Sequence, residues 1–178
     1  TGGRAACQDD FETFDVMRKS QFLIWDLPLL ESYWQDLQEG KAQGRNLVME
    51  KYAYMMESTA PKEYEAIATG LPKISEEKQA MVEQIVAIQV GWREEFAEKY
   101  PHLSGQARII HTSEDTLYDI SFETYLRGEL KTYSMQTLVL YGRRIVAFVQ
   151  EQKNMTEEIM RYTTAFYGYK TLEDAEIK

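Results

Sequence analysis

The apolar residues of this chain recur at spacings of three and four, which is the pattern of amphipathic helices packed around a core. The clearest example is the segment 75–100, which begins at the N-cap residue Ser75 and ends before Pro101. A second clear helix is expected from Ser134 to about Gln152. The expected core stripes of these two helices are Met81, Ile85, Ile88, Trp92 and Phe96, and Leu138, Tyr141, Ile145, Phe148 and Val149.

Polar cap residues predict where the other helices begin. Short side chains with a hydrogen-bond acceptor favour the N-cap position, and the candidates are Asp9 or Asp10 for the first helix and then Asp26, Asn46 and Asn154. The helices near the N-terminus are expected to bury Phe11, Phe14, Met17 and Ile24, and then Leu30, Tyr33 and Leu37. The best candidate for a strand, 108–111, is only a few residues long and lies in the longest expected loop, about 101–120. The pattern therefore predicts an all-α helical bundle.

The two halves of the chain also resemble each other. Phe11-Glu12-Thr13-Phe14 recurs as Phe122-Glu123-Thr124-Tyr125. After this motif, a constant difference in residue number aligns the helix caps and apolar stripes of the first half with those of the second. At that spacing Asp26 aligns with Ser134, Tyr33 with Tyr141, and Asn46 with Asn154. We predict one domain over 1–178, in which two three-helix repeats, 10–68 and 121–178, are joined by the long helix 75–100 and the loop 101–120.

Composition restricts the class of protein. A chain of 178 residues with 44% hydrophobic and 28% charged positions can form one core, so it is not disordered as a whole. No apolar run is long enough for a membrane span. A net charge of -9 disfavours nucleic acid, because contact with phosphates needs a basic surface. Cys7 is the single cysteine, so no intramolecular disulfide can form, and we expect a cytoplasmic protein.

Signatures of catalysis are sparse. The sequence contains no His-x-x-x-His or Glu-x-x-His pair and no glycine-rich phosphate loop, so it indicates no metal site and identifies no cofactor. Cys7 precedes the first helix, where the helix dipole favours a thiolate, and His111 is its one plausible base. The acids Asp9 and Asp10 oppose this, since negative charge raises the pKa of a thiol. Cys7 and His111 are therefore weak catalytic candidates, and ordinary polar loops are the simpler interpretation.

Several polar strings carry a resemblance to a known family. The segments 2–14, 17–22, 41–46, 50–53, 55–61 and 121–130 resemble a bacterial family described as a domain of unknown function, number four-one-two-five. The resemblance covers nearly the whole chain. It implies a bacterial, cytoplasmic protein, and it supplies no activity or catalytic residue that could be carried over.

The strings behind the resemblance are rich in polar residues, whereas a purely structural bundle would be recognised by its apolar stripes. We therefore expect a site where the N-terminal Gly-Gly-Arg-x-x-Cys-Gln loop meets the segments 18–21, 50–51 and 127–129. The candidate ligand-binding residues are Arg4, Gln8, Arg18, Gln21, Lys51, Arg127 and Glu129.

Convergent arginines and tyrosines favour binding of a small anionic metabolite or of a partner protein. The alternatives are an enzyme with acid–base or cysteine chemistry in the same polar cluster, and a structural or oligomer-forming module such as a homodimer.

Overall fold

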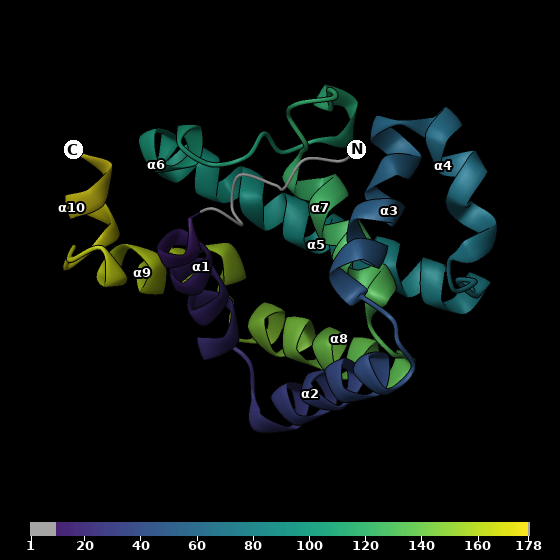
Figure 1. The fold of residues 1–178 in the computed structure, drawn as a ribbon. Helices are drawn as coiled ribbons and strands as arrows, with labels where there is room; N and C mark the ends of the chain where they lie inside the picture. Colours follow the sequence, from purple (N-terminus) through teal and green to yellow (C-terminus); the bar gives the residue numbers. More distant parts are fainter. Residues whose placement is uncertain (1–9, 178) are drawn as a thin grey trace.

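The computed structural model describes residues 10–177, and within them every regular element is a helix (Figure 1). This confirms the all-α prediction. The helices are α1 (Phe11–Leu23), α2 (Leu27–Ala42), α3 (Leu47–Thr59), α4 (Pro61–Ile67), α5 (Glu76–Lys99), α6 (Pro101–Gly105), α7 (Phe122–Thr132), α8 (Met135–Gln150), α9 (Met155–Phe166) and α10 (Leu172–Glu176), with 3-10 turns η2 (Ala68–Gly70) and η3 (Thr112–Glu114).

The predicted caps are confirmed. The side chains of these cap residues each accept a hydrogen bond from the backbone N–H three positions further on, which satisfies one of the free donors at the start of a helix. The residues are Asp10, Asp26, Asn46, Ser75, Ser134 and Asn154. These bonds are local in sequence, and therefore the helix starts could be predicted well.

The helices of the N-terminal half pair with those of the C-terminal half in reverse order. Helix α1 packs on α9, α2 on α8, and α3 on α7, at the left, bottom and right of Figure 1. Helix α5 lies against α7, α8 and α9. A twofold exchange of the repeats would turn the α1–α9 contact into the α7–α3 contact. The duplication stays a prediction, and this pairing supports it.

The main core lies among α2, α5, α7 and α8. Its fully buried apolar side chains include Leu29, Val82, Leu130, Leu138 and Ile145. A smaller cluster joins the end of α5 to α6 and α10, and it contains Phe96, Tyr100, Leu103, Leu172 and Ala175. Helix α7 packs against α3 and against α5, and these contacts position the pockets described below.

Some predicted core positions are wrong. Ile88 is 38% exposed, and the buried position beside it belongs to Gln89, whose amide donates to the Tyr141 hydroxyl at 2.7 Å. A polar residue with a buried partner can thus replace an apolar one in a stripe. Other residues expected in the core but exposed are Phe11, Phe14, Met17, Leu37 and Val149.

The segment 108–111, the best candidate for a strand in an otherwise helical pattern, forms no strand in the described part of the chain. The carbonyls of Ile109 and Ile110 accept hydrogen bonds from the backbone N–H groups of Phe122 and Glu123, the first residues of α7. The segment therefore satisfies donors at a helix start instead of pairing with another strand.

Candidate functional site

Helix α7 separates two pockets on the surface of the molecule. Its residues Thr124, Arg127, Gly128 and Lys131 share one face, and they line a pocket of about 370 Å³ between α3, α5 and α7, the Arg127–Lys131 pocket. Tyr125 lies on the other face and lines a pocket of about 260 Å³ between α1, α3 and α7, the Arg18–Lys51 pocket. Charged side chains lie at the back of both pockets.

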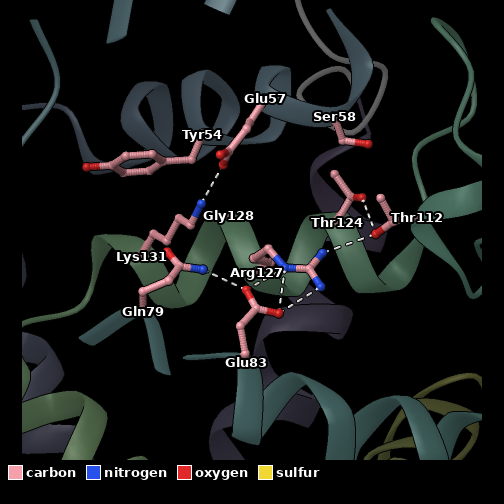
Figure 2. A pocket seen from close by; sticks show the side chains of 10 residues that line it. All are labelled: Tyr54, Glu57, Ser58, Gln79, Glu83, Thr112, Thr124, Arg127, Gly128 and Lys131. Carbon is pink, nitrogen blue, oxygen red and sulfur yellow. Dashed lines mark hydrogen bonds and ion pairs between the residues drawn. The ribbon is translucent and has the colours of Figure 1, made fainter. Parts of the chain in front are cut away.

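Figure 2 shows the Arg127–Lys131 pocket. Helices α3 and α5 face the two cations of α7 across it, and η3 contributes to its rim. Besides the four residues of α7, the lining residues are Tyr54, Glu57 and Ser58 of α3, Gln79 and Glu83 of α5, and Thr112 of η3.

The two cations of this pocket, Lys131 and Arg127, are more buried than Glu57 and Glu83, the carboxylates that line the pocket with them. The Lys131 side chain is only 6% exposed, and its ammonium lies 2.6 Å from a carboxylate oxygen of Glu57, which is 54% exposed. Arg127 donates to Glu83 through Nε at 2.9 Å and Nη2 at 3.0 Å, and it also donates to Glu123. The protein thus fixes the cations, whereas Glu57 and Glu83 reach them from the solvent side.

Hydrogen bonds keep two partly buried carboxylates beside this pocket, Glu123 and Asp115, in their ionised form. Burial alone would raise the pKa of Glu123, but hydrogen bonds from Arg127 and from the Thr112 backbone lower it. Burial would likewise raise the pKa of Asp115, which hydrogen bonds from Thr124 and Ser121 lower instead. Both carboxylates are therefore ionised at neutral pH.

Hydroxyl groups line the side of the pocket nearest Asp115. The Ser58 hydroxyl donates to Asp115 at 2.9 Å, and the Thr124 hydroxyl donates to the same carboxylate. The hydroxyls of Thr112 and Thr124 lie 2.9 Å apart. The pocket consequently offers ionic groups on one side and neutral hydrogen-bonding groups on the other (Figure 2).

A buried ionic cluster lies behind the Arg18–Lys51 pocket. Glu129 accepts hydrogen bonds from Arg18 at 2.7 Å and from Lys51 at 3.3 Å, and Lys51 also donates to the Tyr125 hydroxyl at 2.6 Å. The three charged side chains are between 6% and 19% exposed. Burial would raise the pKa of Glu129, but the charges of Arg18 and Lys51 hold it below its ordinary value.

The structure divides the candidate residues between the two pockets. Arg18, Gln21, Lys51 and Glu129 come together, with Gln21 accepting a hydrogen bond from Arg18 at 3.2 Å. Arg127 is on the opposite side of α7, in the other pocket. Their roles in binding stay predictions. Arg4, Cys7 and Gln8 lie outside the described residues.

His111 lies beside the Arg127–Lys131 pocket. Its Nε2 is 3.2 Å from Glu94, and its Nδ1 is 4.0 Å from Glu123, the partner of Arg127. Whether it works with Cys7 stays a prediction.

Sequence reasoning missed Lys131, Glu57 and Glu83. A signal for Lys131 exists, because it stands four residues after Arg127 and so shares its helix face. The glutamates belong to α3 and α5, and no sequence spacing relates them to α7. In the region 10–177, no group of three or more His, Cys, Asp or Glu residues is arranged to hold a metal ion. None of the described helices has the length and apolar character to cross a membrane.

Comparison with known proteins identifies a family. A family model described as "Protein of unknown function (DUF4125)" matches residues 1–177, essentially the whole chain, and confirms the resemblance found in the sequence. No curated protein and no solved structure gives a match.

Proposed function

We propose a function for this chain, which belongs to the DUF4125 family of proteins of unknown function: it binds a small anionic metabolite in the Arg127–Lys131 pocket. The observation that carries the proposal is the arrangement of Lys131, a nearly buried ammonium whose carboxylate partner, Glu57, is half exposed. A ligand carboxylate or phosphate can take the place of Glu57 without moving the backbone.

The energetics favour such an exchange. A charged side chain held away from water needs a partner of opposite charge, whatever molecule supplies it. Glu57 reaches Lys131 from the solvent side, so a ligand anion could replace it while Lys131 keeps a partner of opposite charge. Glu83, which is 44% exposed, stands in the same relation to Arg127. One anionic ligand could therefore replace one or both glutamates.

The remaining lining residues suit a polar metabolite better than a partner protein. Ser58, Thr112 and Thr124 carry hydroxyls, and Gln79 carries an amide that donates to Glu83. Groups of this kind orient a small ligand in a concave site. Among the described residues that line this pocket, Arg127 is the one that was also selected from the sequence as a candidate ligand-binding residue.

The decisive experiment compares two variants of the Lys131–Glu57 ion pair. Removing the carboxylate and removing the ammonium should change the affinity for an anion in opposite directions. Isothermal titration calorimetry would measure binding of succinate and of inorganic phosphate to the whole chain. We expect Glu57→Gln to tighten binding about tenfold, equivalent to about 1.4 kcal/mol, because it removes the internal competitor. Lys131→Met should abolish binding, because it removes the ammonium and keeps an unbranched apolar side chain of similar length.

Glu151→Gln is the matched control, because Glu151 forms an exposed ion pair with Lys153 outside the pocket. It should leave affinity unchanged. If neither anion binds the wild-type chain or Glu57→Gln with a dissociation constant below about 1 mM, or if Glu57→Gln weakens binding, the proposal is wrong.

A further inference from the structure

The ionic cluster behind the Arg18–Lys51 pocket has more positive than negative charge. Among residues 10–177, Glu129 is the one carboxylate within ion-pair distance of Arg18 or Lys51. The cluster therefore has two cations for one anion, at side chains that are mostly buried. In such surroundings charges interact more strongly than in water, so the excess charge attracts an anion.

Helix packing does not require this cluster. Buried ion pairs can often be replaced by apolar residues at no loss of stability. The chain contains an example, because the repeat alignment sets Ile159 of α9 at the position of Lys51 and Gln21 of α1 at that of Glu129. Helices α1 and α9 pack against each other although these two positions are uncharged, and Ile159 packs against the main core. The charges at the α3–α7 contact thus call for another explanation.

The walls of the pocket are apolar and largely aromatic. Phe11, Phe14 and Val48 line it together with the rings of Tyr52 and Tyr125. The Lys51 ammonium lies 3.9 Å from the centre of the Tyr125 ring, and Arg18 lies 5.9 Å from the centre of the Phe14 ring. Phe11 is 76% exposed, although its size and apolar character would favour burial. A flat apolar group fits between these rings.

We infer that the Arg18–Lys51 pocket is a second binding site, which takes a monoanion with a flat apolar body, of the class of aromatic carboxylates. The carboxylate lies against Lys51 and Arg18 and supplies the missing negative charge. The ring of the ligand lies among Phe11, Phe14 and Tyr125. This inference does not depend on the function proposed for the other pocket, because α7 separates the two sites.

Calorimetric titration of the whole chain with three probes tests the inference. Benzoate has both the charge and the ring, benzyl alcohol has the ring alone, and acetate has the charge alone. We expect benzoate to bind at least tenfold more tightly than either of the others, and its affinity to fall as salt is added. Equal binding of benzoate and benzyl alcohol, or no measurable binding of benzoate, would overturn the inference.

Variants locate the binding. Lys51→Met should weaken benzoate binding at least tenfold, whereas the control Lys131→Met, on the other face of α7, should leave it unchanged. The reverse result would place benzoate in the Arg127–Lys131 pocket and overturn the inference without touching the proposed function. If Lys51→Met does not fold, Tyr125→Phe is the second test, because it removes one hydrogen bond of Lys51 and should change the affinity for benzoate and not that for succinate.

Discussion

Gly128 of α7 lies directly against the backbone of Lys51 in α3. A Cβ atom at Gly128 would be 3.0 Å from the Lys51 carbonyl oxygen and 2.7 Å from Cγ of Met55. The absence of a side chain at Gly128 therefore sets how closely α3 approaches α7. Both pockets depend on this distance, since each has lining residues from both helices.

Gly128→Ala should accordingly destabilise the protein. Overpacking costs about 1–3 kcal/mol, which exceeds the gain of about 1 kcal/mol from replacing glycine within a helix. Gly91→Ala in α5 is the control, because its Cβ would meet nothing within 4 Å. It should raise the unfolding free energy measured in urea. Equal effects of the two substitutions would show that the α3–α7 contact accommodates a methyl group at position 128.

The ends of α2 and α8 allow a prediction about the internal repeat. Gly44 (φ 69°) and Gln152 (φ 54°) both have left-handed backbone conformations, at positions that the repeat alignment equates. The hydrogen bonds around them also correspond: Arg45 N–H donates to the Gly40 carbonyl at 2.8 Å, and Lys153 N–H donates to that of Phe148 at 2.9 Å. The two helix ends therefore share one local structure, as expected if the predicted duplication is real.

Gln152→Gly should therefore stabilise the protein by about 0.5–1 kcal/mol, because a left-handed conformation is unfavourable for residues other than glycine. Gln150→Gly, in the last turn of α8, should destabilise it by a similar amount. Thermal denaturation of both variants measures the contrast. A loss of stability in Gln152→Gly would show that the Gln152 side chain contributes more than its backbone conformation costs.

Interactions between near neighbours could be predicted from the sequence, and interactions between distant residues could not. Asp26 and Asn154 accept hydrogen bonds from residues three positions away, so their residue types and positions predict the contacts. Gln89, by contrast, is buried because its amide meets the hydroxyl of Tyr141, a residue of another helix. Apolar periodicity contains no information about such a partner. The predicted apolar stripe of α5 therefore includes the exposed Ile88 and omits the buried Gln89.

The candidate sites follow the same rule. Arg18 and Lys51 were selected as polar residues in unusual strings, but their common partner Glu129 could be assigned only once α1, α3 and α7 were in place. Arg127 was grouped with them because the segment 127–129 lies in one of these strings and is the repeat counterpart of the segment 18–21. Two residues that are two positions apart on a helix point in different directions, and this separates Arg127 from the cluster.

The pKa of Glu129 predicts a pH dependence of stability. The folded-state pKa is held below the ordinary value of 4.5, so the ionised carboxylate stabilises the folded state above that pH. The contribution is lost as the pH falls through the folded-state pKa. Glu129→Gln should lower the unfolding free energy by about 3–5 kcal/mol at pH 7, and the deficit should shrink as the pH drops below 4.5. Urea denaturation at several pH values measures the loss of unfolding free energy and its change with pH. A loss that does not change with pH would contradict the lowered pKa of Glu129 in the folded state.

The two cations that bind Glu129 should contribute unequally to stability. Arg18 lies closer to the carboxylate than Lys51 and also donates to Gln21, so Arg18→Met leaves Glu129 with its weaker partner. Lys51→Met leaves the Arg18–Glu129 pair intact and removes the excess positive charge from a buried position. We therefore expect Lys51→Met to retain the wild-type unfolding free energy within about 1 kcal/mol, and Arg18→Met to lose more. If Lys51→Met proved the more destabilising, the ammonium would be part of the structural framework, and its presence at the α3–α7 contact would need no ligand to explain it.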